Sequence, residues 1–389
     1  MRIGIDARWI FEKISGIGSY TQELIAHLPE VDQQNHYVLL FGSRTVMERT
    51  SNLARLEERR NVETVLFEYS PFSWRSQTLL PRRLRKLNLD VYHAPNYMIP
   101  FPAFAKDASR KTACVMTIHD LIPLIFPDHA PKSKKSRLFP LFKKIMLAAA
   151  ARADLIIAPS ECSRNDIIAR LKIPETKRSR VVVIPEGVDA RYKPLPQPSP
   201  SKVVLYVGRQ DPYKNLASLV RAFAKVHEAV PSAVLRVIGP PDKRYPEAFE
   251  LARELNILPH IDWHGYVDNA GLLAAYQQAA VLVLPSRYEG FGLPVVEAMA
   301  CGTPVVCSNV SSLPEVAGDA ALMADPGDAS AFAEHIVNVL TRPELARGLR
   351  EKGLARAAQF TWQKTAEQTL KAYQQARDEL RPETGDQRL

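Results

Sequence analysis

The sequence predicts an α/β protein of two doubly wound domains, each built on a parallel sheet that helices cover on both faces. Three observations support this prediction. The chain has 389 residues, which is too many for one ordinary core. Short apolar runs alternate with amphipathic helical segments, as they do in βαβ units. This alternation breaks at a proline-rich stretch and then starts again.

The first half of the alternation predicts an N-terminal domain over residues 1–193. Amphipathic segments such as 19–28 and 141–152 lie between several apolar runs and are expected to be helices. The apolar runs expected to be strands are residues 2–7, 37–41, 62–67, 91–93, 113–118, 155–158 and 181–184.

The break falls at residues 194–201, which we predict to be a linker. Residues 193–201 hold four prolines in nine positions, and such a composition favours a semi-rigid hinge. The pattern restarts in a second domain, residues 202–361, with strands expected at 203–207, 234–238, 261–264, 281–284, 304–307 and 321–323. Residues 362–380 are expected to form a polar helix, and the last nine residues to fray. In such sheets ligands bind beyond the carboxyl ends of the strands, and here also in a cleft between the domains.

Composition places the chain among soluble globular proteins, with 46% hydrophobic and 24% charged residues. The sequence has no run of 18 apolar residues, and its first ten residues lack the form of a signal peptide, so we expect a cytoplasmic protein. The four cysteines include no CxxC pair, which favours reduced, buried thiols over a metal or redox site. They are Cys114, Cys162, Cys301 and Cys307.

The net charge of +9 is unevenly distributed. Residues 1–200 hold 31 Lys and Arg against 20 Asp and Glu, and the excess gathers at residues 82–86 and 132–144. This surface either binds acidic partners, such as phosphate or anionic lipid, or is a plain solvated face. Nucleic acid is disfavoured, because no recognition module or aromatic-interleaved basic strand is visible.

The most specific motif is residues 286–304, SRYEGFGLPVVEAMACGTP. It follows an apolar strand, and Pro294 suits the first turn of a helix. The motif places Glu289 in a glycine loop and Glu297 eight residues later, inside the helix. Backbone amides lie between the two carboxylates, so the motif is suited to a ligand that carries hydroxyls and phosphates.

A second motif, GRQDPYKN at residues 208–215, follows the first strand of the second domain. Arg209 and Lys214 put two cations at a strand end and a helix start, where they can neutralise a diphosphate. A solvated charge pair is the alternative interpretation.

Two weaker motifs lie in the first domain. Gly16 and Gly18 open the first helix, where bare backbone can approach a phosphate, although Thr21 replaces the third glycine of a dinucleotide fingerprint. His119, next to Asp120 at a strand end, could bond a sugar hydroxyl, act as an acid or base, or be structural. The sequence has no D-x-D, so a carboxylate-held metal on the diphosphate is not expected.

Together these motifs resemble those of the retaining GT-B glycosyltransferases of family 4, also called glycosyl transferases group 1. The resemblance covers the chain from Gly16 to Trp362, and its most specific parts are residues 289–297 and 208–215. It implies a GT-B fold in which two Rossmann-like domains face each other across a cleft. It also implies that the final segment, residues 362–389, crosses back to the N-terminal domain. One departure is Glu186, because the family commonly has Asn before Gly-Val-Asp.

The resemblance also implies site roles. Gly16 and Gly18 would approach the donor phosphate or the acceptor, and His119 would contact the transferred sugar. Arg209 and Lys214 would bind the diphosphate without a metal or other cofactor. Glu297 would bind the ribose, and the donor sugar would be held by Glu289, Gly290, Phe291, Gly292 and Leu293. The leaving phosphate would assist the incoming hydroxyl on the same face of the sugar.

The segment His119–Asp120–Leu121 and the prolines after it are similar to those of bacterial mannosyltransferases of O-antigen or exopolysaccharide synthesis. The resemblance therefore implies GDP-mannose as donor, a glycan or lipid-diphosphate-linked acceptor, and peripheral contact with an anionic inner membrane. Four alternatives stay open: a UDP-sugar donor, a GT-B epimerase or phosphorylase, a nicotinamide-dependent oxidoreductase, and a catalytically silent scaffold. The acceptor, the linkage and the oligomeric state are not fixed by the sequence.

Overall fold

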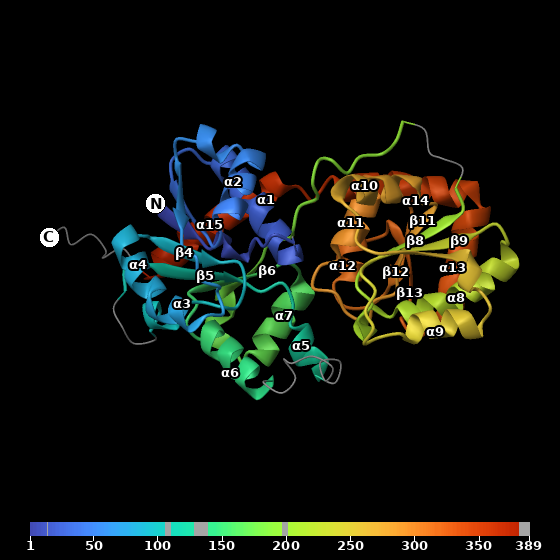
Figure 1. Ribbon diagram of the computed structural model, residues 1–389, viewed down its shortest axis with the longest axis horizontal. Coiled ribbons are helices and arrows are strands. Elements are labelled where there is room, and N and C mark those ends of the chain that lie inside the picture. Colours follow the sequence, from blue (N-terminus) through green and yellow to red (C-terminus); the bar gives the residue numbers. More distant parts are fainter. Residues whose placement is uncertain (14, 106–109, 128–138, 197–200, 381–389) are drawn as a thin grey trace. The chain divides into compact units, whose positions relative to one another are not determined.

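The computed structural model describes the whole chain except residues 14, 106–109, 128–138, 197–200 and 381–389 (Figure 1). Two compact units form: unit 1 comprises Met1–Leu124, Arg137–Gly187 and Trp362–Leu389, and unit 2 comprises Ile125–Ser136 and Val188–Thr361. Each unit is an α/β structure on one parallel sheet, so the predicted doubly wound fold class is confirmed. Of the basic stretch at residues 132–144, residues 132–138 lie outside the described part of the chain.

Unit 1 is built on a seven-stranded parallel sheet in the order β3-β2-β1-β4-β5-β6-β7. Its strands are β1 (Arg2–Ile5), β2 (His36–Phe41), β3 (Val62–Leu66), β4 (Val91–Ala94), β5 (Ala113–Thr117), β6 (Leu155–Ala158) and β7 (Val181–Val183). Its helices are α1 (Gly16–Val31), α2 (Arg44–Leu53), α3 (Trp74–Thr78), α4 (Leu80–Leu87), α6 (Phe139–Ala150), α7 (Glu161–Arg170) and α15 (Trp362–Leu380). Short 3₁₀ turns are η1 (Ala7–Trp9), η2 (Leu56–Glu58), η3 (Phe101–Ala103) and η6 (Glu175–Arg180), and α5 (Ile122–Ile125) lies where the two units divide the chain.

Unit 2 is built on a six-stranded parallel sheet in the order β10-β9-β8-β11-β12-β13. Its strands are β8 (Val203–Val207), β9 (Val234–Ile238), β10 (Ile261–His264), β11 (Val281–Leu284), β12 (Val305–Ser308) and β13 (Ala321–Ala324). Its helices are α8 (Leu216–Ala229), α9 (Glu247–Glu254), α10 (Asn269–Gln278), α11 (Leu293–Ala300), α12 (Leu313–Ala317), α13 (Ala329–Thr341) and α14 (Pro343–Ala357), with 3₁₀ turns η7 (Pro212–Lys214) and η8 (Leu258–His260).

Both sheets have a topological switch point, where the chain reverses the direction in which it adds strands. In unit 1 this point lies between β1 and β4, and in unit 2 between β8 and β11. In open α/β sheets, the loops at the carboxyl ends of these two strands form the usual ligand crevice. The two motifs singled out in the second domain follow β8 and β11, so the fold brings them to the same place.

The core of unit 1 includes the final helix. α15 packs with α1 in one buried cluster, in which Tyr20 and Leu24 of α1 meet Trp362 and Tyr373 of α15. The rings of Tyr20 and Trp362 meet edge to face at 5.8 Å. Because these side chains are almost fully buried, α15 completes the hydrophobic core of unit 1 rather than lying loose on its surface.

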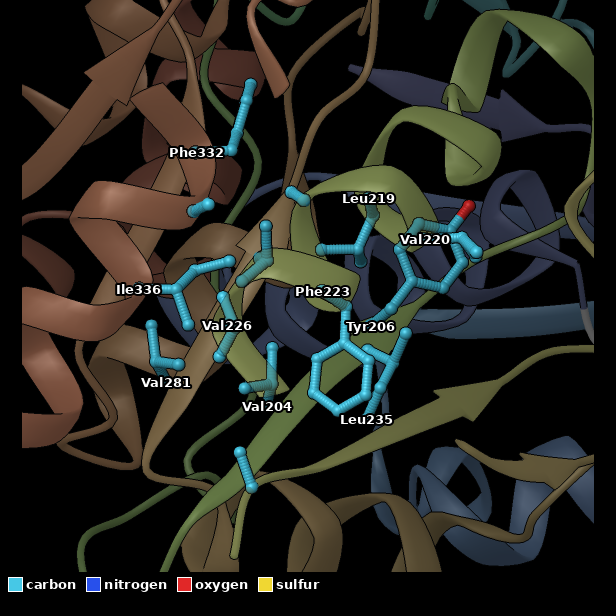
Figure 2. Close-up of a cluster of buried hydrophobic side chains, with 14 of the residues drawn as sticks. Val204, Tyr206, Leu219, Val220, Phe223, Val226, Leu235, Val281, Phe332 and Ile336 are labelled. Atoms are coloured by element: carbon cyan, nitrogen blue, oxygen red, sulfur yellow. The ribbon is translucent and has the colours of Figure 1, made fainter. Parts of the chain in front are cut away.

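One core cluster of unit 2 lies between its sheet and the helices α8 and α13, and a second cluster includes residues of α10, α11 and α12. Phe223 and Val226 of α8 and Ile336 of α13 are fully or almost fully buried against Val204 and Val281 of the sheet (Figure 2). The β-branched and aliphatic runs of β8 and β11 are buried along most of their length, as expected for central parallel strands. This rigid layer fixes the loops that follow both strands.

The predicted first strand, residues 2–7, is too long at its end. β1 stops at Ile5, because the Asp6 carboxylate accepts a hydrogen bond from the backbone N–H of Arg8 and so caps η1. Asp6 also forms a buried ion pair with Arg8 at 2.6 Å and accepts a hydrogen bond from Tyr92 at 2.7 Å.

In the predicted linker, the described backbone at Leu195 accepts a hydrogen bond from Arg350 of unit 2.

Candidate functional site

A buried ion pair lies at the switch point of unit 2. Lys214 ends η7 after β8, and Glu289 lies in the loop after β11. The Lys214 Nζ atom lies 2.7 Å from Oε1 and 2.8 Å from Oε2 of Glu289, and the two side chains are only 14% and 8% exposed. The fold therefore joins one residue from each of the two sequence motifs.

The two loops are also tied together through their backbones. Asn215 takes the left-handed conformation, with φ of 60°, and its side-chain Nδ2 group donates to the backbone carbonyl of Pro285 at 2.9 Å and to that of Pro326 at 2.7 Å. The backbone N–H of Arg287 donates to the carbonyl of Tyr213 at 2.7 Å. These bonds hold Lys214 and Glu289 in place independently of their own attraction.

Three serines hold Glu289, and the sequence motifs had not pointed to them. The Ser286 hydroxyl donates to Glu289 Oε1 at 2.6 Å, and the Ser311 hydroxyl accepts from the Glu289 backbone N–H at 3.0 Å. The Ser312 hydroxyl donates to the carbonyls of Glu289 and Phe291 at 3.0 and 2.7 Å. Only Ser286 could have been suspected from sequence, because it lies three residues before Glu289.

The glycine loop has the backbone geometry that its sequence requires. Gly292 has φ of 109° and precedes α11, and a Cβ atom there would lie 2.8 Å from Leu313. Phe291 is buried against Phe360, with ring centroids 5.6 Å apart, so its side chain belongs to the core. Gly290 and Leu293 flank this turn. Residues 290–293, which were predicted to hold the donor sugar, therefore form one loop that offers a ligand backbone rather than side-chain contacts.

Arg209 is placed differently from Lys214. Its side chain is 62% exposed and its Nε atom lies 2.7 Å from Asp211 Oδ2, in the same loop. The carbonyl of Arg209 accepts a hydrogen bond from the buried Tyr206 hydroxyl at 2.7 Å, which anchors the backbone and leaves the guanidinium at the surface. Both predicted cations form ion pairs, but Lys214 is buried in its pair and Arg209 is largely exposed to solvent.

Glu297 lies apart from the ion pair, in an environment of phenol groups. Its Oε2 atom accepts a hydrogen bond from the Tyr276 hydroxyl at 2.7 Å. Burial raises the pKa of Glu297, and the hydroxyl groups of Tyr276 and Tyr192 and the charge of Arg191 oppose part of that rise. No sequence motif points to Tyr192 or Tyr276, which precede Glu297 by 105 and 21 residues.

In unit 1, His119 follows β5 and forms a close pair with Glu186. The His119 Nδ1 atom lies 2.8 Å from Glu186 Oε1, with the side chains 15% and 6% exposed. Burial alone would lower the pKa of His119, but the hydrogen bond and the charge of Glu186 outweigh it and raise the pKa. Glu186 had been given no role in the sequence analysis, although its identity departs from the family pattern.

A second histidine lies beside this pair, and its pKa is shifted in the opposite direction. His93 of β4 contacts Thr117 through Nε2 at 2.8 Å and Tyr373 of α15 through Nδ1 at 2.7 Å. Burial, with the charge of His119, lowers the pKa of His93 to about 3. Thr117 also bonds Tyr20 of α1 at 3.1 Å, so one buried polar network links α1, β4, β5 and α15.

The two glycines of the first domain open α1. Ser15 caps the helix by accepting from the backbone N–H of Gly18 at 3.3 Å. A Cβ atom on Gly18 would lie 3.2 Å from the carbonyl of Trp9, whereas one on Gly16 would meet nothing within 4 Å. Gly18 is thus needed for packing, while the space beside Gly16 is open.

Across the part of the chain that the structure describes, no three His, Cys, Asp or Glu side chains are grouped so that they could hold a metal ion. The four cysteines are thiols rather than disulfides, with Cys114, Cys301 and Cys307 buried and Cys162 partly exposed. None of the described helices is both long and apolar enough to cross a membrane.

Comparison with known proteins identifies the family of the chain. The family model described as Glycosyl transferases group 1 matches residues 189–356, and the one described as Glycosyltransferase Family 4 matches residues 14–192. The O-antigen chain mannosyltransferase B of Escherichia coli is 31% identical over 92% of this chain and 96% of its own length.

Solved structures show the same architecture. Sucrose-phosphate synthase from Thermosynechococcus elongatus has a TM-score of 0.72 at 22% identity, over 96% of this chain and 98% of its own. HepE from Anabaena, in complex with UDP and glucose, has a TM-score of 0.73 at 18% identity, over 96% and 99%.

The fold is therefore that of the GT-B glycosyltransferases. The chain belongs to the glycosyltransferases of group 1 and family 4, and it is a hexosyltransferase.

Proposed function

We propose that this protein transfers mannose from GDP-mannose to a glycan or lipid-diphosphate-linked acceptor, with retention of the anomeric configuration, in the synthesis of a cell-surface polysaccharide. The name of the Escherichia coli relative supports the sugar and the pathway class. The observation that carries the proposal is the Lys214–Glu289 pair at the switch point of unit 2, since this is where open α/β sheets bind nucleotides.

The pair has bonding capacity left for a donor substrate. An ammonium group has three donors, and the two short contacts of Lys214 with Glu289 leave at least one for a phosphate oxygen. A carboxylate offers about four acceptor positions, so Glu289 can accept from sugar hydroxyls in addition to Lys214 and Ser286. We assign Lys214 and Arg209 to the diphosphate, and Glu289 and the amides of residues 290–293 to the sugar.

The remaining assignments follow the resemblance. Glu297 would bind the ribose hydroxyls, for which Tyr192 and Tyr276 orient its carboxylate. Gly16, Gly18 and His119 of unit 1 would contact the donor or the acceptor. The protein's main catalytic task is then to stabilise the negative charge that develops on the leaving diphosphate. No metal takes part in this proposal, because the two cations supply that charge.

The donor is tested by a thermal-shift panel of nucleoside diphosphates and nucleotide sugars. GDP and GDP-mannose should raise the melting temperature more than UDP or ADP compounds, and incubation with acceptor should release GDP. A preference for UDP compounds would overturn the donor assignment. Inversion at C2 without release of nucleoside diphosphate would indicate an epimerase, and dependence on inorganic phosphate a phosphorylase.

The acceptor proposal includes contact with an anionic membrane, supported by one face of unit 1. Backbone hydrogen bonds from Leu79 to Arg75 and from Arg83 to Leu79 run α3 and α4 nearly into one helix. Its buried stripe is Ser76, Leu80, Leu84 and Leu87, and its exposed side carries Arg75, Arg82, Arg83, Arg85 and Lys86. Trp74 and Phe72 at its start are 70% and 54% exposed, and no acidic residue occurs between Glu68 and Asp90. Exposed aromatic side chains beside clustered cations favour an anionic lipid interface.

Liposome flotation of the full chain tests this contact. The protein should float with vesicles of phosphatidylcholine and phosphatidylglycerol at low salt, and high salt should release it because exposed charges are screened. The variant R82E/R83E should lose flotation, whereas K364E/K371E, with the same charge change on α15, should keep it. Equal flotation of both variants, or none by the wild type, would refute the assignment of this face.

A further inference from the structure

Glu186 is a buried acid at a position where the family commonly has Asn. It lies between β7 and Gly187, the last residue of this part of unit 1. Only 5% of the residue is exposed, and the backbone carbonyl of Pro185 before it accepts a hydrogen bond from Thr365 of α15 at 2.8 Å. A buried carboxylate is costly unless it is paired, and the partner of Glu186 is the imidazole of His119.

We propose that Glu186 is a positioning residue for His119: it fixes one proton on Nδ1 and stabilises the protonated form of the ring, whose Nε2 proton is then available for donation to an oxygen of the sugar donor. This inference rests on the proposed function for the identity of the ligand only. The placement and charge of the ring are properties of unit 1 by itself.

The orientation of the ring follows from its contacts. A carboxylate can only accept, so the 2.8 Å contact with Glu186 requires the proton on Nδ1. The ring of Tyr20 meets that of His119 edge to face at 4.7 Å, which limits rotation on a second side. The carbonyl of His119 also accepts from the Ser163 hydroxyl at 3.2 Å, so the backbone that carries the ring is held as well.

The charge of the ring follows from the groups that face it. Glu186 and Asp120 favour the cation, and so does the backbone of Pro95. Burial opposes it, but the pKa of His119 is raised on balance. Neighbouring His93 does not compete for a second positive charge, because its pKa is lowered to about 3. Tyr20, the other titratable side chain in contact, stays protonated since burial raises its pKa.

The remaining ring nitrogen is where a ligand would bind. His119 Nε2 is buried and has no hydrogen-bond partner among the residues that the structure describes. Pro95 adds to the stabilisation of the cation without making a hydrogen bond of normal geometry to Nε2. A buried donor without a partner is unfavourable by itself, and a hydroxyl or phosphate oxygen of the donor would satisfy it.

The first test measures the charge of His119 without reference to activity. Histidine side-chain NMR of the full chain, with the His119 signal identified by its loss in His119→Gln, should give a pKa above the ordinary value of about 6.5. Glu186→Gln and Glu186→Asn should lower it by about one unit or more, and Glu186→Asp should restore part of the shift. A wild-type value at or below the ordinary one overturns the proposal even if no variant folds.

The second test measures the pH dependence of turnover. Because the cation is lost as pH rises through the raised pKa, kcat/KM should fall on the alkaline side in the wild type. In Glu186→Gln this fall should begin at lower pH, with Glu186→Asp between the two. An alkaline limb that does not move in Glu186→Gln overturns the role in turnover. If the NMR shift is found but no nucleotide sugar is a substrate, the proposed function fails and the positioning role stands.

Discussion

The sheets of the two units share one strand order over six strands, with β7 added in unit 1, but the units place different kinds of ion pair beyond their strands. In unit 2 the pair is Lys214 with Glu289, on loops after the two strands that flank the switch point. In unit 1 it is His119 with Glu186, after β5 and β7, which lie on either side of β6. A lysine keeps its charge over the physiological range, whereas a histidine does not. Unit 2 is thus suited to permanent neutralisation of a diphosphate, and unit 1 to a contact that depends on pH.

The largest effect is expected from Lys214→Ala. Loss of one preorganised donor to developing negative charge should reduce turnover on the order of 10² to 10³-fold. It also leaves Glu289 buried without its cation, at a cost of about 3–5 kcal/mol in the free energy of unfolding. Initial rates with the donor found in the thermal-shift panel, and urea unfolding, measure the two effects.

Two control variants separate charge from packing. Lys214→Ala/Glu289→Gln removes the uncompensated charge, so it should recover much of the lost stability but none of the lost turnover. Arg209→Ala should reduce turnover on the same order of magnitude, with little effect on unfolding because its side chain is largely exposed. Near-wild-type turnover in Lys214→Ala would contradict the division of roles between the units.

The next largest effect is expected in the glycine loop. Gly292→Ala places a side chain on a residue with φ of 109° and brings a Cβ atom within 2.8 Å of Leu313. The strained backbone should cost about 1–3 kcal/mol in the free energy of unfolding. Urea unfolding checks this value, and an unchanged midpoint would show that the loop relaxes without loss.

The unit 2 site was more accessible to sequence reasoning than that of unit 1. Glu289, Gly292 and Glu297 lie in one short motif, and Lys214 lies in a second motif at another strand end, but the meeting of Lys214 with Glu289 depends on β8 and β11 being neighbours in the sheet. The Tyr276 bond to Glu297, and the Ser311 and Ser312 bonds around Glu289, depend on side-chain packing between distant segments.

In unit 1 the strands were predictable from their apolar runs, but the partner of His119 was not. Glu186 is 67 residues away and joins His119 only because β5, β6 and β7 are neighbours in the sheet. Similarly, the apolar run alone would continue β1 beyond Ile5. The strand ends there because the Asp6 side chain bonds the backbone N–H of Arg8 and starts a 3₁₀ turn. The periodicity of apolar residues does not reveal where a local side-chain hydrogen bond will end a strand.

A smaller effect is expected from Tyr276→Phe. The variant removes one hydrogen bond from the Glu297 carboxylate, which should cost about 1–2 kcal/mol in stability at neutral pH. The pKa of Glu297 should rise further, because burial already raises it and the Tyr276 bond opposes that rise. Urea unfolding at neutral and mildly acidic pH measures both, since the cost should shrink once the carboxylate is protonated. An equal cost at both pH values would contradict a charged Glu297.

The smallest effect on stability is expected from Gly16→Ala, which isolates the backbone contribution of unit 1. A Cβ atom there meets nothing within 4 Å, and the residue begins α1 with an ordinary helical backbone, so the melting temperature should not fall. If the first turn of α1 contacts a phosphate or acceptor, the added methyl group should nevertheless raise the KM of one substrate. Gly18→Ala is the matched control, since its Cβ atom would lie 3.2 Å from the Trp9 carbonyl and should lower stability. Unchanged KM values in Gly16→Ala would remove Gly16 from the substrate site.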